Sequence, residues 1–65
     1  MEAHLVKPGT KVMITDEEVR VPPAAKKLQA GDVLIMGNLD GMYCNATDEE
    51  GERVYLAGWT EVEKI

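Results

Sequence analysis

The chain has 65 residues, of which 45% are hydrophobic and 29% charged, and its seven basic and twelve acidic residues give a formal charge of −5. This length excludes a second domain and any large α/β fold, and the apolar content is too high for a disordered chain. The acidic balance counts against nucleic-acid binding, which needs clustered lysine and arginine.

Cysteine usage and the N-terminal sequence bear on the compartment. The single cysteine excludes an internal disulfide, whereas a secreted domain of this size commonly carries several. The N-terminal residues include neither a basic segment nor an apolar run, and the longest apolar run, Val33 to Met36, is too short to span a bilayer. We therefore expect a cytoplasmic protein without membrane association.

Apolar patterning predicts an all-β domain. Alternation places Val12 and Ile14 on one face of the first strand, and the second strand is apolar on both faces, as a central strand would be. A helical pattern occurs only in Pro23 to Ala30, which is long enough for one turn before Gly31 ends it. The predicted strands are residues 10–15, 32–36, 42–47, 52–56 and 62–65.

The connections between these strands differ in length. Residues 16–30 form a long first loop, and loops of this length are often functional. Asn38 to Gly41 is predicted to be a reverse turn, and Asp48 to Gly51 a hairpin turn with Gly51 in the left-handed conformation.

The hairpin turn also predicts the register of its two strands. Directly opposed residues share a face, so a three-residue loop ending at Gly51 pairs Ala46 with Val54 and Cys44 with Leu56. Cys44 and Ala46 then face inward together with Met42, and Tyr55 points outward opposite Asn45. The methionines Met13, Met36 and Met42 are expected to fill the core in place of the missing phenylalanine.

Several short motifs, in this order and spacing, resemble those of the Src homology 3-like barrels. Gly31 to Leu34 is similar to the entry of that family's second strand, and Asp40 to Tyr43 to the start of its third. Glu50-Gly51 falls at the distal hairpin, and Leu56 to Glu63 falls on the closing segment. Gly58-Trp59 is similar to the bacterial and phage type. The resemblance covers residues 9 to 65 and implies a single five-stranded barrel, with a short 3₁₀ turn before the last strand, as the one domain of residues 1–65.

The eukaryotic members of that family bind polyproline helices in an aromatic groove. Here Met42, Gly58 and Glu61 occupy three of the groove positions, which argues against proline-peptide binding. Acidic residues in the long loop are retained. In that family such residues meet basic side chains of the ligand.

Catalytic and metal sites find little support in the sequence. His4 and Cys44 are the only strong transition-metal ligands besides carboxylates, whereas structural zinc needs about four ligands. We expect His4 to be an exposed terminal residue and Cys44 a small buried apolar one. The acidic residues Asp48 to Glu50 are expected on an exposed turn, so no catalytic residue, metal or cofactor is predicted.

The aromatic residues are the remaining functional signal. Tyr43, Tyr55 and Trp59 are all the aromatics of the chain, and outward Tyr and Trp side chains are favoured anchors of interfaces. The alternative is that Trp59 plugs one end of the barrel and that one tyrosine covers the core edge. The predicted partner-binding residues are these three aromatics together with Asp16, Glu17 and Glu18 of the long loop, whose charge would steer a basic partner.

The sequence thus predicts a non-enzymatic acidic module that binds a protein partner. Small domains of this kind suit a phage or mobile-element accessory protein that inhibits a host factor. One alternative is a structural subunit of a homo-oligomer or virion. Another is an oligomeric small-molecule binder or enzyme with a pocket at the subunit boundary. Sedimentation separates these hypotheses, because a strictly monomeric protein excludes both oligomers.

Overall fold

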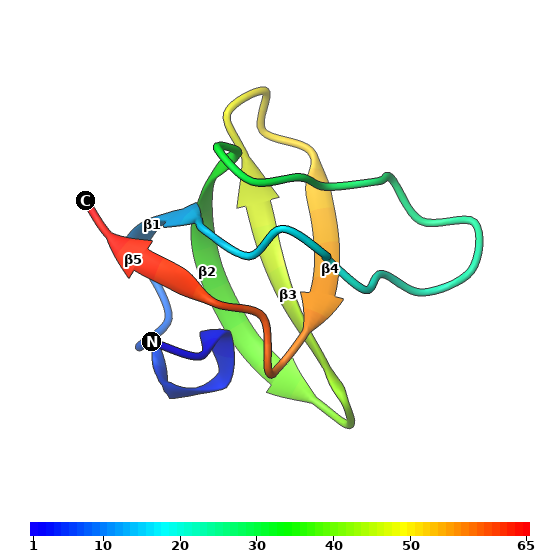
Figure 1. The fold of residues 1–65 in the computed structure, drawn as a ribbon, viewed down its shortest axis with the longest axis horizontal. Helices are drawn as coiled ribbons and strands as arrows, with labels where there is room; N and C mark the ends of the chain where they lie inside the picture. The colour runs from blue at the N-terminus through cyan, green and yellow to red at the C-terminus, as the bar shows by residue number, and fades with distance from the viewer.

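A computed structural model describes residues 1–65 and contains one antiparallel sheet of five strands (Figure 1). The strands follow the order β4-β3-β2-β1-β5, so the first and last strands of the chain are neighbours. The prediction of an all-β class is confirmed. The elements are η1 (Ala3–Leu5), β1 (Lys11–Ile14), β2 (Val33–Asp40), β3 (Tyr43–Asp48), β4 (Arg53–Ala57) and β5 (Val62–Lys64).

The β3–β4 hairpin has the predicted register. Cys44 lies opposite Leu56, Ala46 opposite Val54, and Asn45 opposite Tyr55. The Asp48 N–H donates to the Glu52 carbonyl at 2.9 Å, which leaves residues 49–51 as a three-residue loop. It ends at Gly51, whose φ of +84° is a conformation that glycine adopts without a Cβ penalty. Alternation and turn chemistry together were sufficient to define this hairpin.

Strand β2 is longer than predicted, because it continues through a β-bulge. Its register with β3 shifts between Met36 and Leu39, so that Gly37 and Asn38 together face a single residue, Asn45. The Asn45 side chain accepts a hydrogen bond from the Asn38 N–H at 3.1 Å. A Cβ at position 37 would collide with that same amide oxygen. Glycine is therefore required at the bulge for space.

The turn after β2 also lies further along the chain than predicted. The prediction of a reverse turn at residues 38–41 is wrong, since Asp40 still pairs with Tyr43 and the loop consists of Gly41 and Met42. Met42 is consequently 45% exposed, and its predicted place in the core is wrong. Met36 is buried as expected, and Met13 is half-buried.

The core consists of the inward residues of all five strands with three additions from outside them. Ala3 and Val6 come from the N-terminal turn and Leu28 from the long loop, while Val19 and Val21 pack against the same cluster. The loop therefore buries apolar surface as well as connecting β1 to β2. The core cluster comprises Ala3, Val6, Val12, Ile14, Leu28, Leu34, Met36, Cys44, Ala46, Val54, Leu56 and Val62.

The sheet is not closed by hydrogen bonds between β4 and β5, which form its two edges. The first arm of the long loop bridges this gap. The Thr15 N–H donates to the Glu61 carbonyl at 3.0 Å, and the Ala57 N–H donates to the Arg20 carbonyl at 2.9 Å. Figure 1 shows the loop crossing in front of β3 and β4 before it returns to β2. The arm thus ties the end of β4 to the segment before β5.

The helical elements are fewer and differently placed than expected. At the place of the predicted 3₁₀ turn before β5, the chain forms one isolated turn. It is closed by a hydrogen bond of 3.0 Å from the Thr60 N–H to the Ala57 carbonyl. A short 3₁₀ helix occurs instead at η1, which the sequence did not suggest. A turn closed by a hydrogen bond from the Ala25 N–H to the Pro22 carbonyl overlaps the start of residues 23–30, and no helix forms there. No helix here has the length and apolar character needed to cross a membrane.

Candidate functional site

The structure places Tyr43 and Tyr55 on the outer face of the β3–β4 hairpin. They alternate along their strands with the buried residues Cys44 and Leu56. Tyr43 lies opposite Ala57, so the two tyrosines occupy diagonal positions on neighbouring strands. Tyr55 is 38% exposed, and Tyr43 is half-buried. The outward orientation predicted for both side chains agrees with this register.

Trp59 lies elsewhere, in the turn between β4 and β5. It is 49% exposed and lines a shallow depression with Leu39 and Met42, which are 52% and 45% exposed. Leu39 lies opposite the inward residue Cys44, so this depression is at the rim of the core. It stays a prediction that Trp59 and both tyrosines belong to a single binding surface. The residues lining the depression are Glu2, His4, Leu39, Gly41, Met42, Gly58 and Trp59.

Backbone hydrogen bonds join the three segments that form this depression. The His4 N–H donates to the Gly58 carbonyl at 2.9 Å, and the Gly58 N–H donates to the Met42 carbonyl at 2.8 Å. A Cβ on Gly58 would lie 3.2 Å from atoms of both His4 and Leu39, so glycine permits this close approach. The depression is therefore built into the fold, because its walls are fixed by main-chain contacts.

The acidic residues of the long loop have unequal roles. The Asp16 carboxylate accepts hydrogen bonds from the N–H groups of Glu18, at 3.2 Å, and Glu61, at 3.1 Å. It therefore holds the start of the loop against the segment that leads into β5. Glu17 and Glu18 are exposed, and their side chains have no hydrogen-bonding partner in the protein. Of the three predicted acidic residues, these two are free to face a ligand.

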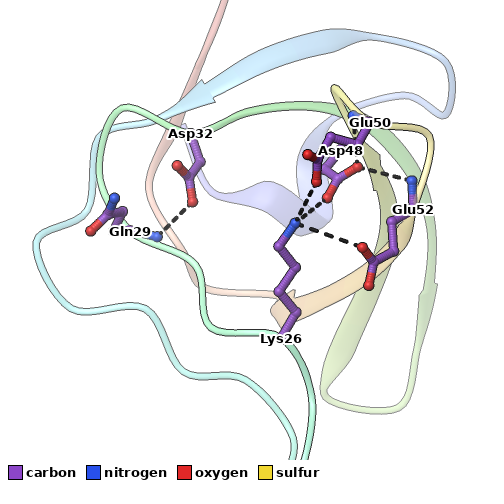
Figure 2. A network of polar contacts seen from close by, with 6 residues as sticks. All are labelled: Lys26, Gln29, Asp32, Asp48, Glu50 and Glu52. Carbon is purple, nitrogen blue, oxygen red and sulfur yellow. Dashed lines mark hydrogen bonds and ion pairs between the residues drawn. The ribbon is translucent and has the colours of Figure 1, made fainter.

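A second charged cluster, which we call the Lys26 cluster, joins the long loop to the β3–β4 hairpin (Figure 2). It contains the Lys26 ammonium and the carboxylates of Asp48, Glu50 and Glu52. The Lys26 Nζ lies 2.6 Å from Asp48 Oδ2, 3.4 Å from Glu50 Oε1 and 3.8 Å from Glu52 Oε1. The three carboxylates could hold a cation, since their oxygens lie within 4.8 Å of one another. The lysine already supplies a positive charge there.

Asp48 is the centre of this cluster. Its Oδ1 accepts hydrogen bonds of 2.9 Å from the N–H groups of both Glu50 and Glu52, in addition to the bond from Lys26. The hydrogen bonds from Lys26 and from the Glu52 backbone hold the pKa of Asp48 below its ordinary value. The bond to Asp48 correspondingly raises the pKa of Lys26. The predicted solvated turn is thus an ordered turn, and sequence reasoning missed its link to the loop.

His4 and Cys44 have the surroundings predicted for them. The His4 side chain is exposed, and its Nε2 lies 2.7 Å from Glu2 Oε1. Cys44 is 2% exposed, and burial raises the pKa of its thiol. A raised pKa disfavours the thiolate, which is the reactive form of cysteine. This environment suits a packing residue rather than a nucleophile.

Comparison with models of known protein families finds no match, and comparisons with curated proteins and with solved structures find none either. Two surface features stand out by their chemistry, the depression at Trp59 and the Lys26 cluster. The first is apolar and open, whereas the second is a charged contact between the long loop and the hairpin, in which one lysine faces three carboxylates.

Proposed function

We propose that the protein is a non-enzymatic interaction module that binds a protein partner, and that the depression at Trp59 is the centre of its binding surface. The observation that carries the proposal is the joint exposure of three large apolar side chains there. Leu39, Met42 and Trp59 are each about half exposed, whereas the twelve residues of the core cluster are buried. Contiguous exposed apolar surface on a small domain is typical of a binding site.

We also propose that the fold is of the Src homology 3-like type. The strand order β4-β3-β2-β1-β5, the long loop between β1 and β2, and the tight β3–β4 hairpin support this proposal. Binding of proline-rich helices is not part of it, because the groove of that family needs aromatic side chains where this chain has Met42 and Glu61. The proposed surface uses Trp59 instead.

Protein binding is favoured over catalysis by the character of the depression. Its volume of about 250 Å³ is below the range of about 300–1,000 Å³ of sites that enclose a small molecule. It is lined by one tryptophan, two other apolar side chains, one histidine and a single carboxylate. Tryptophan is among the residues that most often dominate the energy of protein interfaces. Such a surface offers contact area, and its exposed His4–Glu2 pair has no serine, threonine or cysteine beside it to act as a nucleophile.

The proposal is tested by affinity capture from a lysate of the source cells, comparing the parent protein with single variants. Trp59→Ala is expected to weaken capture at least about tenfold, as truncation of an interface anchor does. Tyr55→Ala tests whether the outer tyrosines belong to the same surface. Ile65→Ala is the matched control, because Ile65 is an apolar residue, 61% exposed, that directly follows β5.

Circular dichroism of each variant must first show an unchanged fold. Equal capture by the parent and a folded Trp59→Ala variant would contradict the proposal. Sedimentation of the parent protein, run alongside, is expected to show a monomer.

A further inference from the structure

We propose that the depression at Trp59 is a binding site for one arginine side chain of the protein partner. This inference rests on the proposed function, since it names the chemistry that the same surface recognises. The first argument is preorganisation. Besides the two bonds through Gly58, the Ala3 N–H donates to the Thr60 carbonyl at 2.8 Å, so main-chain contacts join the N-terminal turn to the β4–β5 turn. A side chain that enters the depression does not have to order its walls.

The second argument is the combination of groups that line the depression. The Trp59 indole, Leu39 and Met42 form its apolar part, and the Glu2 carboxylate, whose side chain is 46% exposed, lies at its edge. No lysine or arginine lines it. An aliphatic stem that ends in a cation matches this arrangement, because the stem packs on apolar surface while the charge meets the π face or the carboxylate.

Arginine fits better than lysine for two reasons. Its planar guanidinium stacks on an indole face and still donates N–H groups at its edge, whereas the lysine ammonium is compact and strongly hydrated. One Glu2 oxygen already lies 2.7 Å from His4 Nε2, so the carboxylate is held in place while keeping further acceptor capacity. A positioned carboxylate beside an aromatic face is suited to a forked donor.

The third argument is the charge around the depression. Asp40 is exposed at the end of β2, next to the Gly41-Met42 turn, and the whole chain carries −5. The Lys26 ammonium is already paired with the Asp48 carboxylate. A basic partner would therefore be attracted at long range and could place its arginine without meeting a lysine or arginine in the depression, where His4 is the one basic residue.

The test uses the full chain and a minimal probe, N-acetyl-arginine amide, in a titration followed by two-dimensional NMR. N-acetyl-citrulline amide is the matched control ligand, because it keeps the shape of arginine but has no charge. Arginine is expected to shift the Trp59 indole N–H and the amide signals of Gly41 and Gly58 at millimolar concentrations. Citrulline is expected to bind at least about threefold more weakly.

Two protein variants test the named groups. Glu2→Gln is expected to weaken binding of the arginine probe at least about threefold, and Trp59→Leu, which keeps apolar area but removes the indole, by a similar factor. Glu63→Gln removes an exposed carboxylate on β5 and is expected to change nothing. Equal binding of arginine and citrulline would overturn the inference, as would shifts confined to the Lys26 cluster or full binding by Glu2→Gln.

Self-association that Trp59→Leu abolishes would also overturn the inference, by assigning the depression to a second copy of the chain. The outcome is separable from that of the proposed function. Capture of a partner that depends on Trp59, in a protein that ignores the arginine probe, would refute only the arginine site. Binding of the probe without any Trp59-dependent capture would instead refute the proposed function.

Discussion

The β-bulge in β2 gives the sharpest test of the fold, through the substitution Gly37→Ala. An added Cβ would overlap the Asn45 side-chain oxygen and lie 2.9 Å from the Asn45 carbonyl oxygen. Rotating the Asn45 side chain away would break its bond to the Asn38 N–H, at about 1 kcal/mol. Relieving the carbonyl contact requires β2 and β3 to shift, which in well-packed regions costs about 1–3 kcal/mol.

The reduced entropy of the unfolded chain offsets about 0.4–1 kcal/mol of this cost, so the expected net loss is about 1–3.5 kcal/mol, with a midpoint of about 2 kcal/mol. For a domain of this size a loss of about 2 kcal/mol corresponds to a fall in Tm of about 8–16 °C. Equilibrium unfolding in urea, followed by far-UV circular dichroism, measures it. Gly41→Ala is the matched control, because Gly41 has a φ of +67° but open space around it. Its expected cost is only the left-handed backbone strain, about 1–2 kcal/mol.

A double-mutant cycle separates the two parts of the contact. Asn45→Ala alone should cost about 1 kcal/mol, since it removes one hydrogen bond. In the Gly37→Ala/Asn45→Ala protein the clash with the amide oxygen is gone, so its loss should be smaller than the two single losses added together. The reasoning about the bulge would be refuted if Gly37→Ala cost no more than Gly41→Ala, or if the two losses were additive.

Four further predictions concern the core, the Lys26 cluster and the Cys44 thiol. Leu56 has no exposed surface, so Leu56→Ala should lower the free energy of unfolding in urea by about 3 kcal/mol. Leu5 is 65% exposed, so Leu5→Ala should change it by no more than about 0.5 kcal/mol. Equal losses would contradict the assigned core. Folding lowers the pKa of Asp48, so the stabilisation by its carboxylate is complete above about pH 4 and is lost as the pH falls through the pKa of the folded protein. The urea midpoint should therefore drop between about pH 5 and pH 2. The drop should be smaller in Asp48→Asn. The pKa of Lys26 is raised on folding, so its charge stabilises the protein below about pH 10 and this stabilisation is lost at higher pH. A urea midpoint that does not change with pH in the alkaline range would count against the ion pair. The Cys44 thiol should react with iodoacetamide at least about tenfold more slowly in the native than in the urea-unfolded protein, and equal rates would mean that it is not buried.

Much of the fold follows from patterns that are local in the sequence. The β3–β4 register was predictable because the pairing of Cys44 with Leu56 is fixed jointly by a period of two and by the loop that ends at Gly51. The extension of β2 was not, because Gly37-Asn38 has the composition of a turn. Only the Asn45 side chain on the neighbouring strand, which accepts the Asn38 N–H, shows that the two residues form a bulge.

The candidate site was only partly accessible from the sequence. Trp59 is a candidate from the sequence because aromatics are scarce, with packing at one end of the fold as the alternative. Its neighbours Leu39 and Glu2 are not, because main-chain hydrogen bonds between distant segments bring them together. No side-chain pattern encodes such bonds. Met42 was predicted to face inward by extending the alternation of β3 back into the preceding turn, where alternation no longer applies.

The central claim is that the depression at Trp59 contacts a protein partner. Hydrogen–deuterium exchange of the protein, alone and in complex with the captured partner, tests it most directly. The account predicts added protection at residues 40–43 and 58–60, on the two turns that border the depression. Protection confined to the Lys26 cluster at residues 48–52, with these turns unchanged, would contradict it.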